Sequence, residues 1–223
     1  MVKNKPIALK SKRLVGTRDT KSTYLIVTEG QETEPNYFNG LKQYYRSTTV
    51  SIQVMPASGT DPLSVVDYAE KLIRNGYTNQ NGKGFGPKSF ENVFVVFDQD
   101  CNVEGRKRAQ AKIKELDGKY KTSTKEAIRF HCIDSVPNFE LWLLLHFERL
   151  HPQKMEIDEP LKRLKRYWPN YQKKSKDVFD KTRPNLNIAI HRAESLNKDP
   201  LREVGDVRTN VHLIVKELIP KTV

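Results

Sequence analysis

Runs of apolar, β-prone residues alternate with amphipathic stretches over the first 136 residues of the chain. Residues 22–28 and 92–97 are apolar without alternation, which is typical of strands buried on both faces of a parallel sheet. Residues 49–55 and 127–133 are two further expected strands. Strands that alternate with helices imply right-handed crossovers. The pattern therefore predicts an α/β fold with a parallel sheet of about four strands and helices on both faces.

Apolar positions at helical spacing fall between these strands, and Pro35 and Pro62 suit the first turns of their helices. After Pro137 the pattern becomes helical only. We expect three parts: a basic N-terminal arm (1–21), an α/β core (22–136) and a helical appendage that completes the site (137–223). The expected helices cover residues 35–45, 62–73, 103–116, 139–147, 161–168, 177–196 with an interruption at Pro184, and 210–219.

The segment 75–87 is rich in Gly, Asn and Lys and is expected to be a long loop. Its glycines, followed by Lys88 and Ser89, resemble a phosphate-binding loop. Pro87 separates the last glycine from Lys88, and a strand follows where such a loop needs a helix. We therefore do not expect nucleotide binding there.

Charge suggests the kind of partner. The chain has 39 Lys and Arg against 27 Asp and Glu, a formal net charge of +12, which favours a polyanion such as DNA or RNA. The arm 1–21 is strongly basic, either for such contacts or as a solubilising tail. No apolar run approaches the roughly 20 residues that span a bilayer, so no membrane association is expected. Two cysteines without a CxxC motif and no signal-like N-terminus favour the cytoplasm.

Three carboxylates stand where parallel strands end. Glu29 follows the first strand, and Asp98 and Asp100 follow the third apolar run. Open parallel sheets place their sites at the carboxyl ends of strands, and residues two apart on an extended segment point to the same side. We therefore expect these three side chains to share Mg²⁺, with Mn²⁺ as the alternative. Read singly, each is also compatible with an ordinary solvated turn residue.

The C-terminal part mixes cations with aromatic residues, a combination suited to phosphate and base contacts. A solvated helix face is the alternative interpretation. His191, Asn210 and His212 are polar candidates for a phosphate contact that the sequence does not place. The cations predicted to bind nucleic acid are Lys162, Arg163, Lys165, Arg166, Lys173, Lys174 and Lys176.

The glutamate at position 29, the glycine after it and the later Asp98-Gln99-Asp100 resemble the Toprim signature of topoisomerases, primases and related nucleases. More specific motifs resemble the RloB family from about Tyr24 to the C-terminus. These motifs are LIVTEGQETEPNYF at 25–38, GTDP at 59–62, VFDQD at 96–100, NFELWLLLHF at 138–147 and TNVH at 209–212.

The resemblance implies a Toprim-like fold, a metal-dependent nuclease of a prokaryotic abortive-infection system and an AAA-type ATPase partner. It also implies that Glu29, Asp98 and Asp100 hold the metal, with Glu34, Asn138 and Glu140 as further motif positions. Asn138 and Glu140 follow the fourth expected strand and are therefore expected to close the same crevice. We therefore expect hydrolysis of phosphodiester bonds in DNA or RNA, with Asn138 and Glu140 among the catalytic residues. The alternative is a non-catalytic nucleic-acid-binding or adaptor subunit of an ATPase complex. The sequence leaves the oligomeric state open.

Overall fold

The computed structural model describes residues 22–45, 50–59, 61–99 and 103–219. The predicted basic arm 1–21, Asp100 and Cys101 lie outside the described residues.

A mixed sheet forms the centre of the molecule, with strand order β2-β1-β5-β6-β7. The first four strands are parallel, as predicted from the apolar runs. Two-residue β7 adds to β6 in antiparallel orientation and comes from the part predicted to be helical only, so that prediction was wrong there. The confirmed class is α/β with a Rossmann-like sheet. The strands are β1 (Ser22–Thr28), β2 (Val50–Pro56), β5 (Asn92–Asp98), β6 (Arg129–Val136) and β7 (Arg208–Thr209).

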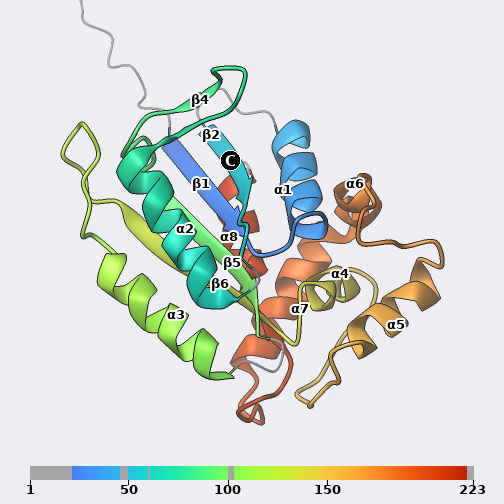
Figure 1. The fold of residues 1–223 in the computed structure, drawn as a ribbon. Helices are drawn as coiled ribbons and strands as arrows, with labels where there is room; N and C mark the ends of the chain where they lie inside the picture. Colours follow the sequence, from blue (N-terminus) through green and yellow to red (C-terminus); the bar gives the residue numbers. More distant parts are fainter. Residues whose placement is uncertain (1–21, 46–49, 60, 100–102, 220–223) are drawn as a thin grey trace, which may run out of the picture.

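Helices α2 (Pro62–Asn75) and α3 (Val103–Leu116) cover one face of the sheet, as Figure 1 shows. They pack on alternate strand residues, among them the fully buried Leu25 and Val27. Asp61 starts α2 as its N-cap, since its Oδ1 accepts hydrogen bonds from the backbone N–H groups of the next turn.

The other face is covered by α1 (Thr33–Tyr44) together with C-terminal helices α4 (Glu140–Leu145), α7 (Leu186–Lys198) and α8 (Val211–Leu218) (Figure 1). One continuous apolar cluster joins these helices to the strands. The C-terminal helices therefore pack as a layer of the core. Burial of all six α4 residues explains why that helix is almost wholly apolar.

The remaining short elements lie outside these layers. Pro184 interrupts the long C-terminal helical stretch, as predicted, within a 3₁₀ turn. The expected loop at 75–87 contains a small hairpin. No helix within the described residues has the length and apolar character needed to span a membrane. The short elements outside the layers are β3 (Tyr77–Thr78), β4 (Gly84–Phe85), α5 (Glu159–Tyr167), α6 (Val178–Thr182) and the turn Arg183–Asn185.

The connections make β1 and β5 the two strands beside the topological switch point. From β1 the chain crosses through α1 to β2 on one side, and from β5 it crosses through α3 to β6 on the other. The two crossover helices lie on opposite faces of the sheet. Such a reversal opens a crevice at the carboxyl ends of the two central strands. Glu29 and Asp98 stand at those ends.

Candidate functional site

The ends of the two central strands are tied together by Glu29. Its backbone N–H donates to the Val96 carbonyl over 2.9 Å, and its Oε2 accepts from the backbone N–H of Asp98 over 3.0 Å. The structure thus brings together two of the three predicted metal ligands. The third, Asp100, lies outside the described residues.

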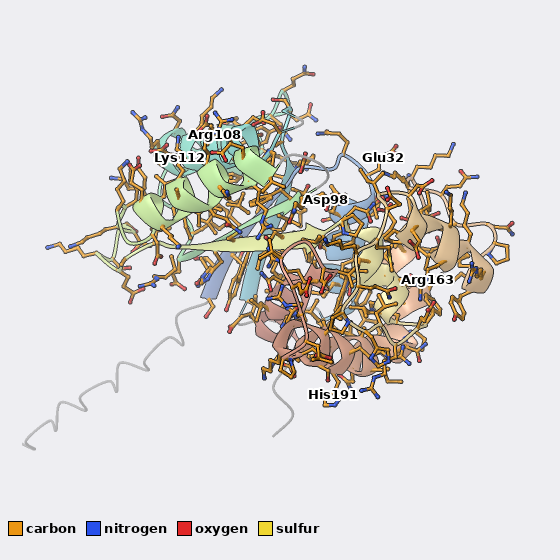
Figure 2. The ribbon with its side chains drawn as sticks, turned by 90° about the horizontal axis from the view of Figure 1, so that it is seen from below. Glu32, Asp98, Arg108, Lys112, Arg163 and His191 are labelled. Atoms are coloured by element: carbon orange, nitrogen blue, oxygen red, sulfur yellow. The ribbon has the colours of Figure 1, made fainter. Side chains whose placement is uncertain are left out.

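A cleft of about 420 Å³ opens at this point. Carboxylates from the ends of β1 and β5 and from α1 and α4 line it, with a lysine beside them. A smaller adjoining cleft of about 250 Å³ shares Asp98, Glu140 and Lys173 and is closed by Asn138 and the start of α5. Figure 2 shows Asp98 where the sheet meets the C-terminal helices. The charged residues of the larger cleft, hereafter the acidic cleft, are Glu29, Glu32, Glu34, Asp98, Glu140 and Lys173.

Two of these carboxylates are buried: Glu34 is 5% exposed and Glu140 is 3% exposed. Oε1 of Glu34 accepts from the Gly30 N–H over 3.2 Å, and Oε1 of Glu140 accepts from the Tyr171 hydroxyl over 3.3 Å. Burial, reinforced by the charge of Glu140, raises the pKa of Glu34 to about 7. The ammonium of Lys173 lies 4.0 Å from Glu140 Oε1, at the exposed rim. The acidic cleft therefore carries concentrated negative charge.

Gly30 leaves room for this arrangement. A Cβ at position 30 would collide with the Glu34 carboxylate. A larger residue at position 30 would therefore displace the Glu34 carboxylate from its place in the cleft.

The donor set fits a hard cation. Carboxylate and amide oxygens are the ligands that Mg²⁺ and Mn²⁺ prefer. The Asn138 amide donates through Nδ2 to the Ile157 carbonyl over 2.6 Å, and its buried Oδ1 has no hydrogen-bond partner among the described residues. An acceptor left without a donor beside several carboxylates suits a cation or its bound water. Within the described ranges, no three acidic, His or Cys side chains are already gathered closely enough to hold one metal ion.

The family model described as RloB-like protein matches residues 24–218. The chain belongs to the RloB-like family. Comparison with curated proteins and with solved structures gives no match.

The cations of this RloB-like chain predicted to bind nucleic acid fall into two groups. Arg163 is 17% exposed and is held by Glu148 and, over 3.3 Å, by Glu159, so the structure uses it within its own packing. Lys162 pairs with Asp158 one turn earlier, although it remains exposed. The other exposed side chains are those of Lys165 and Arg166 on α5 and of Lys173, Lys174 and Lys176 on the following loop.

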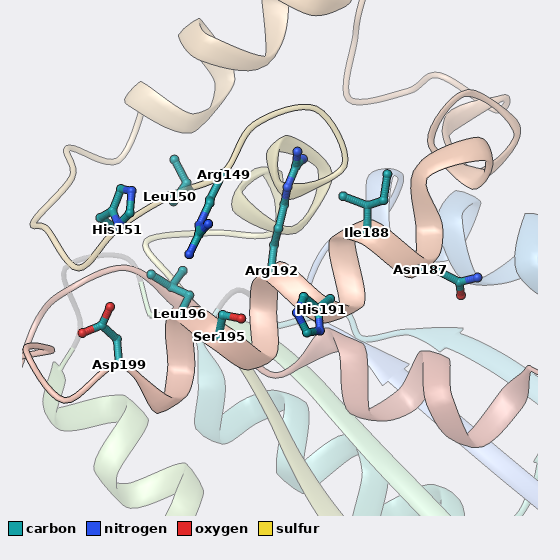
Figure 3. A pocket seen from close by; sticks show the side chains of 10 residues that line it. All are labelled: Arg149, Leu150, His151, Asn187, Ile188, His191, Arg192, Ser195, Leu196 and Asp199. Carbon is teal, nitrogen blue, oxygen red and sulfur yellow. The ribbon is translucent and has the colours of Figure 1, made fainter.

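The histidines of the C-terminal part do not enter the acidic cleft. His191 lines a separate cleft of about 510 Å³ between α7 and residues 149–151, where Figure 3 shows it near Arg192 and Ser195. Figure 2 places it far from Asp98. His212 is buried and its Nδ1 lies 3.1 Å from the Thr209 carbonyl. Both are therefore separate from the predicted site.

Sequence reasoning missed a buried polar cluster next to the cleft, centred on Asp134 in β6. Asn210, unplaced from the sequence, is part of it. The available signal was a carboxylate in the buried second half of a strand, because a buried charge requires partners. The partners themselves come from residues more than 70 positions further on as well as from α3, and only the fold shows them.

Proposed function

We propose that this RloB-like protein is a Toprim-type, metal-dependent nuclease that hydrolyses phosphodiester bonds in DNA or RNA. The observation that carries the proposal is the acidic cleft at the topological switch point, where Glu29 and Asp98 are joined by a 3.0 Å hydrogen bond. From the RloB resemblance we extend the proposal to an effector of an anti-phage abortive-infection system, working with an AAA-type ATPase partner.

Glu29 and Asp98, with Asp100 from outside the described residues, would hold Mg²⁺ or Mn²⁺. When bound, such an ion polarises the phosphodiester and lowers the pKa of an attacking water. Asn138 and Glu140 would close the opposite wall and orient water or phosphate through their oxygens. Lys173, exposed at the rim, supplies a positive charge for a phosphate oxygen.

Glu34 is suited to proton transfer within this site. Its pKa of about 7 lets it hold or release a proton near neutral pH. Because Oε1 accepts from the Gly30 N–H, the proton would reside on Oε2. Tyr171 donates to Glu140 and so keeps that neighbouring carboxylate in place.

The substrate would approach over the exposed cations of α5 and its following loop. Lys173 of the loop lines both clefts, and Leu161 of α5 lines the smaller one, so these two segments border the site. Contacts of this kind hold the phosphate backbone without reading sequence.

The test is cleavage of mixed DNA and RNA substrates with Mg²⁺ or Mn²⁺. Wild type is expected to cleave. The Asp98→Ala/Asp100→Ala variant is expected to cleave at least about 100-fold more slowly, because two of the proposed cation ligands are removed. The matched control is Glu126→Ala/Glu203→Ala, which removes two exposed acids elsewhere and is expected to keep full activity.

Cleavage by the Asp98/Asp100 variant at the wild-type rate would overturn the proposed site. If wild type binds nucleic acid but cleaves none with either metal, even with its co-purified partner present, the adaptor role replaces the nuclease.

A further inference from the structure

Asp134 near the end of β6 is the centre of a buried charge network. Its side chain is fully buried, and it pairs with Arg106 Nε over 2.9 Å and with Arg208. The amides of Asn210 and Gln110 donate to its two oxygens over 2.8 and 3.2 Å. A buried carboxylate needs such partners, and here they tie α3, β7 and the start of α8 to the sheet.

One branch of this network reaches Gln99, the residue that follows Asp98. Arg106 donates through Nη1 to Oε1 of Gln99, the residue between Asp98 and Asp100. The backbone N–H of Gln99 also donates to the Ser135 carbonyl over 2.9 Å. Gln99 is buried, and its main chain is held by β6 while its side chain is held by Arg106 of α3.

Because the Gln99 side chain is held in place, the side to which Asp98 points is also determined. Successive residues of an extended segment project to opposite sides. With the Gln99 side chain held by Arg106, its predecessor Asp98 is directed to the other side, where it lines the acidic cleft. A largely buried arginine held by a buried carboxylate has little freedom to let Gln99 rotate.

We propose that Arg106, anchored by Asp134, is a positioning residue that holds Gln99, thereby orients Asp98 in the acidic cleft, and so sets the affinity of the cleft for a divalent cation. This inference rests on the proposed function. Arg106 does not line the acidic cleft, and it acts on the cleft through Gln99.

The network supplies its own control in Arg208. Arg106 and Arg208 pair with the same carboxylate oxygen of Asp134, and Arg106 is the one that also donates to Gln99. Arg106→Gln and Arg208→Gln therefore change the charge equally and each remove one ion pair. Gln99→Leu removes the last link while leaving the Asp134–Arg106 pair intact, which protects the test against failure of an arginine variant to fold.

The experiment is a calorimetric titration of the full chain with Mn²⁺, with thermal unfolding recorded on the same samples. Arg106→Gln and Gln99→Leu are expected to weaken Mn²⁺ binding about 10- to 100-fold, the usual range for residues behind metal ligands. Arg208→Gln is expected to lower the unfolding temperature while keeping Mn²⁺ affinity within about threefold of wild type.

The outcomes separate the two proposals. Wild type that binds Mn²⁺ while Arg106→Gln and Gln99→Leu bind it equally well would overturn the positioning role and leave the metal-dependent function standing. An equal loss in Arg208→Gln would overturn it too, since general support of the fold would then explain the effect. Wild type that binds no Mn²⁺ would overturn the metal site itself, and the positioning role with it.

Discussion

Burial and the charge of Glu140 both raise the pKa of Glu34, which makes the stability of the protein depend on the ionisation of the acidic cleft. That pKa rises from 4.5 in the unfolded chain to about 7 in the folded protein. A carboxyl whose pKa is raised by folding stabilises the folded state fully below pH 4.5 and loses that contribution as pH rises through 7. Ionised Glu34 thus destabilises the folded protein above pH 7 in the absence of divalent cations.

Glu34→Gln tests this coupling. In EDTA, the variant is expected to gain stability relative to wild type between about pH 5 and pH 8, by up to about 3 kcal/mol, because glutamine cannot ionise. Urea unfolding at the two pH values measures the difference. A stability difference that is the same at both pH values would contradict the raised pKa.

Residues at strand ends were the predictable part of the site. Glu29 and Asp98 follow apolar runs, and parallel strands bring such ends together whatever the rest of the chain does. The burial of Glu140 was not predictable from spacing, because it depends on Tyr171 packing against it from a distant loop. The ion pair of Arg163 was equally unpredictable: this cation, counted toward a surface patch, is held by Glu148 in the structure.

At the scale of elements, α4 joins the acidic cleft to the core. Glu140 is its first residue, and its apolar residues are buried between the sheet and α5 and α7. Leu144→Ala is expected to destabilise the protein by about 2–5 kcal/mol, because a fully buried side chain leaves a cavity. Leu213→Ala on the exposed side of α8 is the matched control, with an expected loss below about 1 kcal/mol.

Denaturant unfolding of both leucine variants gives the comparison, and similar losses of stability would show that α4 is not a central packing element.

Elements such as α4 were predictable from the sequence because their apolar runs are long. Strand β7 was not, since two residues carry no periodicity and Arg208 and Thr209 pair with β6 only through the fold.

At the scale of the whole molecule, a net charge of +12 surrounds a cleft that is itself acidic. The two features are compatible if cations bind the phosphate backbone while the carboxylates act on one bond. Removing four exposed cations of the α5 side is then expected to weaken nucleic-acid binding about equally for all sequences and to flatten its salt dependence. The cations to be changed to Ala are Lys165, Arg166, Lys174 and Lys176.

Fluorescence anisotropy of labelled single strands between about 50 and 200 mM salt measures this slope, which should fall by roughly 0.7 for each phosphate that the variant no longer neutralises. A control with four exposed cations on α2, α3 and the loop after them separates local contacts from net charge. If binding depends only on net charge, both sets of substitutions will reduce the salt dependence equally. That result would contradict the proposal that the substrate approaches over the α5 side. The control set is Lys71, Arg108, Lys114 and Lys121.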